Sequence, residues 1–151
     1  MDRLFMFIAT GAGTGYLPKA PGTWGSLLGV ALWFGLRHLG PASYVLIIAA
    51  LFLVGAACAG AAEKIVDHAD PGLVVIDEIV GQLIALTAAP HHPLAVLAAF
   101  LLFRLFDILK PFPVGWFDRH IHGGLGIMLD DVIAGLYALL LVQIIWRLAN
   151  P

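Results

Sequence analysis

The stretch Phe103–Gly135, FRLFDILKPFPVGWFDRHIHGGLGIMLDDVIAG, contains the end of one apolar segment, a connecting loop and the start of another segment. Five charged side chains stand near the ends of these segments: Arg104, Asp107, Lys110, Asp130 and Asp131. An unpaired charge in apolar surroundings costs several kcal/mol or neutralises, so charges in such positions need partners. The stretch therefore predicts that two hydrophobic segments bring their charges together at one loop and form a site there.

The composition is typical of a membrane protein. Of the 151 residues, 61% are hydrophobic and 12% are charged, whereas soluble domains have roughly 45–50% apolar residues. The length allows one domain, so we expect a single integral-membrane domain at residues 1–151. The net charge of −2 favours lipid over nucleic acid as the partner, and the oligomeric state stays open. Cys58 is the only cysteine, which excludes an internal disulfide and a multi-cysteine metal site.

Proline and glycine pairs divide the chain into apolar segments, and no strand-like alternation competes with a helical interpretation. The five segments are Trp24–Leu36, Tyr44–Ala62, Leu73–Ala89, Leu94–Leu109 and Ile127–Ala149. The second and fifth are long enough to span a hydrocarbon layer of about 30 Å, whereas the shorter ones need tilting or protein cover. Residues Met1–Ala9 predict a short interfacial helix without a cleaved signal peptide, followed by a loop at Thr10–Ser26. The predicted fold is therefore an all-α polytopic bundle of about five hydrophobic helices.

The distribution of basic residues predicts the orientation of this bundle. With a cytosolic N-terminus, five crossings place six basic residues at or near the inner side: Arg3, Lys19, Lys64, Arg104, Lys110 and Arg119. Only Arg37 and Arg147 then lie outside, as the positive-inside rule prefers. The same arrangement brings the unusual charges of three segments to one cytosolic face, including the loop Lys110–Gly126.

Two acidic pairs occur in similar local sequences, IDEIVGQL from Ile76 and LDDVIAGL from Leu129. Adjacent carboxylates on a helix point about 100° apart, so a cage needs side chains from several helices. Five carboxylates are candidate metal ligands: Asp77, Glu78, Asp107, Asp130 and Asp131. Oxygen ligands select a hard cation, and we expect Mg²⁺. Gly81 and Gly135 would let the helices approach closely, and Lys19, Arg104 and Lys110 are left to bind phosphate oxygens.

Simpler interpretations of the same residues stay open. Arg104, Asp107 and Lys110 have the spacing of an ion-pair ladder at a helix end. Asp130 and Asp131 suit a helix N-terminus through the helix dipole. Neither interpretation explains why all these charges lie in one part of the chain.

Four blocks resemble signature sequences of the bacterial phosphatidylglycerophosphatase A family: LPKAPGTWGS, VIDEIVGQ, FRLFDILKPFP and GGLGIMLDDVIAG. The resemblance implies a magnesium-dependent inner-membrane phosphatase that removes the terminal phosphate of phosphatidylglycerophosphate and yields phosphatidylglycerol. It also implies that the family's acidic positions correspond to the five candidate metal ligands above. Its basic positions then correspond to Lys19, Arg104 and Lys110.

The mechanism that we expect is attack by metal-activated water, because the chain lacks the C-x5-R and DxDx[TV] nucleophile motifs. Asp131 or Asp130 is the leading candidate for the general base, with Lys110 and Arg104 on the phosphate. Alternatives are another lipid phosphatase or a phosphotransferase, although the CDP-alcohol pattern DGxxARxxxxxxxxGxxxD is absent. A non-enzymatic ion-coupled membrane subunit is a further alternative.

Overall fold

The computed structural model describes residues 1–149, except for the side chain of Asp118. Within that range the chain forms helices and no strands, which confirms the predicted all-α class. The elements are α1 (Asp2–Ala9), the short 3₁₀ helix η1 (Thr14–Tyr16), α2 (Pro21–Leu36), α3 (Pro41–Val66), α4 (Ile76–Ala85), α5 (Pro93–Leu109), α6 (Val114–His120) and α7 (Gly123–Ala149). The predicted domain 1–151 extends two residues beyond the described part.

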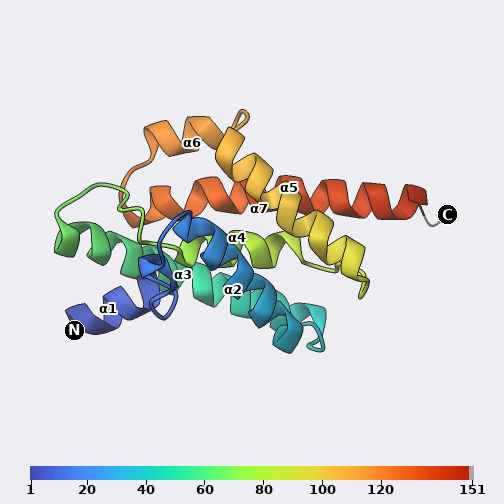
Figure 1. Ribbon diagram of the computed structural model, residues 1–151, viewed down its shortest axis with the longest axis horizontal. Helices are drawn as coiled ribbons and strands as arrows, with labels where there is room; N and C mark the ends of the chain where they lie inside the picture. The colour runs from blue at the N-terminus through green and yellow to red at the C-terminus, as the bar shows by residue number, and fades with distance from the viewer. Residues whose placement is uncertain (150–151) are drawn as a thin grey trace.

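Helices α2, α3, α4, α5 and α7 run lengthwise through the molecule, α2 and α5 at a slant, and they alternate in direction (Figure 1). Helices α2, α4 and α7 start toward the end of the molecule where the N-terminus lies, and α3 and α5 run back toward it; the C-terminus lies at the opposite end. We call the first end the acidic end, because Asp77, Glu78, Asp130 and Asp131 stand near the starts of α4 and α7. The predicted convergence of the charged segment ends is thus present in the fold.

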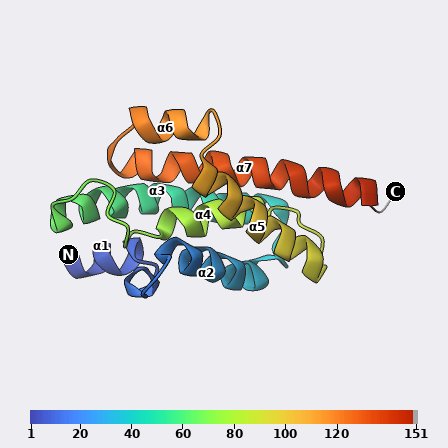
Figure 2. The same ribbon diagram turned by 45° about the horizontal axis from the view of Figure 1, so that its top comes forward.

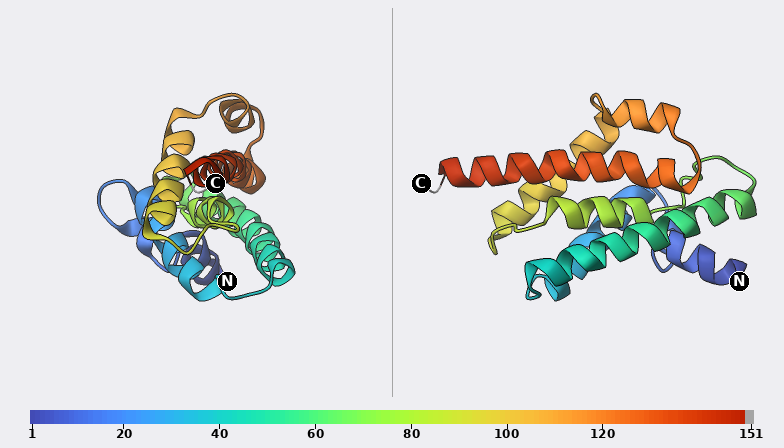
Figure 3. Two further views of the ribbon diagram at one scale, coloured as in Figure 1. Left: turned by 90° about the vertical axis from the view of Figure 1, so that its right-hand side faces the viewer. Right: turned by 180° about the vertical axis from the view of Figure 1, so that it is seen from behind.

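Helix α4 is the centre of the bundle, with α3, α7, α5 and α2 arranged around it (Figures 2 and 3). Eight of its ten residues are buried. It packs most extensively against α7, where a Cβ built on Gly135 would lie 2.5 Å from the carbonyl oxygen of Gly81. The predicted close approach at Gly81 and Gly135 is therefore confirmed, and it brings the acidic residues of the two helices together.

The predicted hydrophobic helix at Leu73–Ala89 is present as α4, but it is helical only at Ile76–Ala85 and is thus shorter than the apolar segment at both ends. At the start, the Val75 N–H donates to the Ala9 carbonyl at 2.9 Å and holds the chain outside the helix. At the other end, Tyr44 Oη donates to the Leu83 carbonyl at 2.7 Å, and Trp33 Nε1 donates to the Leu86 carbonyl at 3.0 Å. Side chains from other helices thus satisfy carbonyls that a longer helix would satisfy itself.

Two predicted loops also contain helical structure. The loop Thr10–Ser26 includes η1 and the first turns of α2, which begins at Pro21, a residue suited to the first helical position. The loop Lys110–Gly126 includes α6, which packs against α7. Tyr137 Oη on α7 donates to the Phe112 carbonyl at 3.0 Å and holds the start of this segment. These short helices depend on contacts across the fold rather than on a local pattern.

Helices α3 and α7 are long and apolar enough to cross a membrane, as the predicted segments Tyr44–Ala62 and Ile127–Ala149 indicated. The short helix predicted at Met1–Ala9 is present as α1, and its interfacial position stays a prediction. Many large apolar side chains on the outer surfaces of α3, α5 and α7 are exposed, among them Leu46, Leu101 and Leu140. The number of crossings stays a prediction.

Candidate active site

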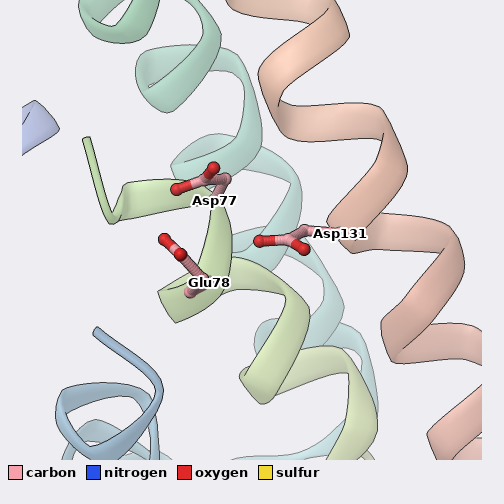
Figure 4. A group of neighbouring side chains, drawn as sticks. All are labelled: Asp77, Glu78 and Asp131. Atoms are coloured by element: carbon pink, nitrogen blue, oxygen red, sulfur yellow. The ribbon is translucent and has the colours of Figure 1, made fainter. Parts of the chain in front are cut away.

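Three carboxylates from two helices face one another at the acidic end (Figure 4). Asp77 and Glu78 come from the first turn of α4, and Asp131 comes from α7. One oxygen of each lies within 4.8 Å of the oxygens of the other two. Asp131 is only 2% exposed. This juxtaposition of negative charge is unfavourable unless a cation or a proton is shared among the carboxylates.

The carboxylate oxygens in this cluster have few partners in the protein. Asp77 Oδ1, Glu78 Oε2 and Asp131 Oδ1 are buried, and none of them has a hydrogen-bond partner among the described residues. Buried polar atoms are normally paired, so such a group points to a ligand. The donor set consists only of carboxylate oxygens, which suits a hard divalent cation such as Mg²⁺ or Mn²⁺. The residues present therefore fit the predicted metal.

Arg104 connects this cluster to α5. Its Nη1 atom lies 2.7 Å from Asp107 Oδ2 and 3.8 Å from Glu78 Oε1, and it donates a long bond of 3.4 Å to Ser26 Oγ. The pair with Asp107 has the i,i+3 spacing expected for a ladder at a helix end. The additional contact with Glu78 lies outside that ladder, because it joins α5 to α4.

Lys110 pairs with α7 rather than with Asp107. Its Nζ atom donates to Asp130 Oδ2 at 2.8 Å. Lys110 ends α5 in the left-handed conformation, with φ 44°, so the chain turns there. The alternative prediction was an ion-pair ladder of Arg104, Asp107 and Lys110 on one helix. In the structure, Arg104 pairs with Asp107 within α5, whereas Lys110 pairs with Asp130 on α7.

The charged residues surround one cleft of about 360 Å³. Seven of the eight predicted site residues line it: Asp77, Glu78, Arg104, Asp107, Lys110, Asp130 and Asp131. Lys19 is exposed and does not line the cleft, although the following residues, Ala20 to Gly22, do. The structure therefore places the predicted phosphate-binding Lys19 outside the cleft, beside its rim.

Three further polar residues line this cleft, although they were not predicted as site residues: Glu63, Asp70 and His122. Glu63 lies in the last turn of the long apolar helix α3, and its Oε1 accepts a hydrogen bond from the Asp70 N–H at 3.1 Å. An acidic residue at the end of an apolar segment was the available signal, the same one that singled out Asp107. The position of Glu63 at the cleft depends on the packing of α3 against α7.

The cleft combines a cation-binding group with two basic side chains. A phosphate monoester carries two negative charges, which repel an attacking nucleophile unless positive groups neutralise them. Arg104 and Lys110 supply such groups within one cleft, and buried carboxylates supply acceptors for a proton. The arrangement is thus suited to phosphoryl transfer to water.

Comparisons with known proteins point to the same class. The family model of phosphatidylglycerophosphatase A matches residues 7–146. The Haemophilus influenzae phosphatidylglycerophosphatase A is 45% identical over 137 residues, 89% of this chain and 84% of that protein. The Escherichia coli phosphatidylglycerophosphatase A is 38% identical over 136 residues, 89% of this chain and 79% of that protein.

A third relative carries a different name. A Bacteroides thetaiotaomicron protein, named provisionally as a phosphatidylinositol-3-phosphatase, is 42% identical over 146 residues, 92% of this chain and 91% of that protein. No solved structure matches the chain.

The fold, the cleft and these relatives together define the class: the protein is a phosphatase. Within that class the chain belongs to the phosphatidylglycerophosphatase A family. The resemblance predicted from four sequence blocks is confirmed. Membership of a phosphatase family also sets aside the alternative of a non-enzymatic subunit.

Proposed function

We propose that the chain hydrolyses the terminal phosphate monoester of phosphatidylglycerophosphate and releases phosphatidylglycerol and inorganic phosphate. The observation that carries this proposal is the cluster of Asp77, Glu78 and Asp131, whose buried oxygens lack protein partners in a cleft that also contains Arg104 and Lys110. The names of the relatives supply the substrate.

Mg²⁺ would be held by Asp77, Glu78 and Asp131, with Asp107 and Asp130 in the same cleft as further candidate ligands. When bound, the cation would neutralise charge on the phosphate and lower the pKa of water.

The protein's own residues have the following proposed roles. Arg104 and Lys110 bind phosphoryl oxygens, which keeps the monoester in line for attack and offsets its charge. Asp131 or Asp130 accepts the proton of the attacking water as general base. Lys19, beside the rim of the cleft, binds the phosphate only if the preceding loop moves inward or the headgroup extends outward.

We place the protein in the bacterial inner membrane, with the cleft toward the cytosol. The two long apolar helices and the exposed leucine side chains support a membrane position, and the basic residues at the acidic end support the orientation. The phosphate headgroup then enters the cleft while the acyl chains stay in the inner leaflet.

Phosphate release by the purified protein tests this function. We expect release from phosphatidylglycerophosphate, loss of release in EDTA and recovery on addition of Mg²⁺. Phosphatidylinositol 3-phosphate serves as the comparison substrate, because the name of the Bacteroides relative raises it. Faster release from the inositol lipid would replace the proposed substrate, and full turnover in chelator would overturn the metal proposal.

Cysteine labelling tests the orientation independently of turnover. Single cysteines at His122, in the cleft, and at His92, at the opposite end, are introduced into a Cys58→Ser background. In oriented vesicles we expect the two positions to react from opposite sides, with His122 on the cytosolic side. Reaction of both from one side would contradict five crossings and favour a partly embedded bundle with re-entrant third and fourth segments.

A further inference from the structure

A second cavity lies at the opposite end of the bundle from the active-site cleft. It is an apolar groove of about 400 Å³ between α2 and α5, a size typical of small-molecule sites, roughly 300–1,000 Å³. Its walls include Leu27, Val30, Val96 and Leu97, and α2 and α5 lie on the same side of the bundle in the end-on view of Figure 3.

The far end of the groove is basic. Arg37 and the imidazoles of His91 and His92 line it, and none of its lining residues is acidic. The Arg37 guanidinium lies over the rings of Trp33 and Phe34, at 5.6 and 5.0 Å from their centroids. Its Nε donates to His38 Nε2 at 3.3 Å. Aromatic stacking holds the guanidinium in place while its planar edge can still donate to an anion.

The distribution of charge along the sequence leaves this end of the bundle without acidic residues. Residues 3–62, 79–106 and 132–151 contain no aspartate or glutamate. The far ends of α2, α3, α5 and α7 fall in these ranges. The basic groups there, Arg37 and Arg147, consequently have no carboxylate nearby in sequence to neutralise them.

The length of α2 sets the separation between the two cavities. Pro21 and Gly22 at its start line the active-site cleft, and Arg37 directly follows its end. Sixteen residues of helix span about 24 Å, most of a hydrocarbon layer of about 30 Å. In the proposed membrane position, the basic end of the groove therefore lies near the leaflet opposite the active site.

A second copy of the chain is a poor occupant for this groove. Copies in one membrane share one orientation. The groove of one copy therefore faces the part of a neighbouring copy that lies at the same depth in the membrane. The acidic residues are confined to the other end, so a neighbour offers Arg37 no counter-charge at that depth. An anionic phospholipid supplies both an apolar chain for the walls of the groove and a negative headgroup for Arg37.

We propose that the α2–α5 groove binds an anionic phospholipid of the leaflet opposite the active site. An acyl chain lies along the apolar walls, and the headgroup phosphate accepts hydrogen bonds from Arg37, with His91 beside it. The inference rests on the membrane position given under the proposed function. It assigns Arg37 to lipid binding and not to catalysis.

Quenching of Trp33 fluorescence by brominated lipids tests the proposal, because Trp33 lines the groove and lies far from the cleft. The probe is the full chain with Trp24, Trp116 and Trp146 replaced by phenylalanine, in phosphatidylcholine vesicles. A small, equal fraction of brominated phosphatidylglycerol or brominated phosphatidylcholine is added. We expect stronger quenching by the anionic lipid.

Variants separate a specific site from general attraction to a basic surface. Arg37→Gln should remove the preference for the anionic lipid, whereas Arg37→Lys should retain part of it. Arg147→Gln is the matched control, because Arg147 is exposed near the same end and does not line the groove. It should leave the preference unchanged.

Several results would overturn the proposal. These are equal quenching by the two lipids in the probe protein, a preference that survives Arg37→Gln, or a preference lost equally in Arg147→Gln. Absence of quenching by either lipid, with crosslinking between copies through the groove, would assign the groove to a second copy. Phosphate release is measured separately in detergent. A protein that prefers the anionic lipid but releases no phosphate would contradict the proposed function and leave the lipid-binding proposal intact.

Discussion

The two acidic pairs of this protein have similar local sequences but make different contacts. On α4, the first residue, Asp77, belongs to the cluster, and the second, Glu78, belongs to it and also contacts Arg104. On α7, the first residue, Asp130, pairs with Lys110, and the second, Asp131, points into the cluster. The two adjacent carboxylates on α7 thus have separate contacts: one belongs to the cluster, and the other forms an ion pair with a basic side chain.

The difference follows from how each helix is rotated against the other. Adjacent side chains point about 100° apart, so both members of a pair rarely face one partner in the same way. The close contact at Gly81 and Gly135 fixes the rotation of α4 against α7. We therefore expect the four carboxylates to differ in their contributions to turnover, although their sequences make them look equivalent.

The largest effect should come from the cluster itself. Asp77→Asn or Asp131→Asn should lower phosphate release by about 10²–10³-fold or more, because each removes a negative charge that would hold the proposed cation beside the phosphate. Turnover is measured on folded protein at saturating Mg²⁺. Asp67→Asn is the matched control, since Asp67 is exposed and does not line the cleft. Normal rates in both cluster variants would place the reaction elsewhere.

The ion-paired carboxylate should contribute less than the cluster. Asp130→Asn should lower turnover by about 10–100-fold, because Asp130 positions Lys110 while Asp131 stays in place. The comparison is made by kcat and KM for Asp130→Asn, Lys110→Met and the double variant. We expect the fold-loss of turnover in the double variant to be smaller than the product of the fold-losses in the two single variants. Each single variant already breaks the same Asp130–Lys110 ion pair, so the second substitution removes little more. A loss in Asp130→Asn as large as in Asp131→Asn would abolish the distinction between the two residues.

The helix contact that fixes this arrangement can be broken directly. Gly135→Ala should destabilise the protein by about 1–3 kcal/mol, because the new Cβ would meet backbone atoms of α4 that cannot move alone. Gly35→Ala is the control, since nothing lies near a Cβ at that position and alanine favours a helix by about 1 kcal/mol. Thermal unfolding in detergent measures both. A lower Tm for Gly35→Ala than for Gly135→Ala would contradict the packing described here.

The smallest effect should come from Cys58 on α3. It is buried in the apolar core and does not line the cleft. Cys58→Ala should leave most of the phosphate release, because a small side chain replaces another small one. Complete loss of turnover in a normally folded Cys58→Ala protein would point to thiol chemistry.

The helical class, the two longest apolar helices and the group of residues that meet at the acidic end could all be predicted from the amino-acid sequence. Those features depend on local composition: apolar runs long enough for a helix, proline and glycine between them, and charges that apolar surroundings do not tolerate unpaired. The interfacial position of Met1–Ala9 and the number of crossings are still predictions from the same signals.

The length of α4, the presence of α6 and the set of residues that line the cleft depend on contacts between distant parts of the chain and could not be predicted from local sequence. Trp33 and Tyr44 cap the end of α4 from other helices, and no local pattern reports such contacts. Lys19 falls outside the cleft and Glu63 inside it, because loop direction and helix packing set their positions. The choice of Asp131 rather than Asp130 for the cluster has the same cause, since helix rotation is fixed by contacts between residues distant in sequence.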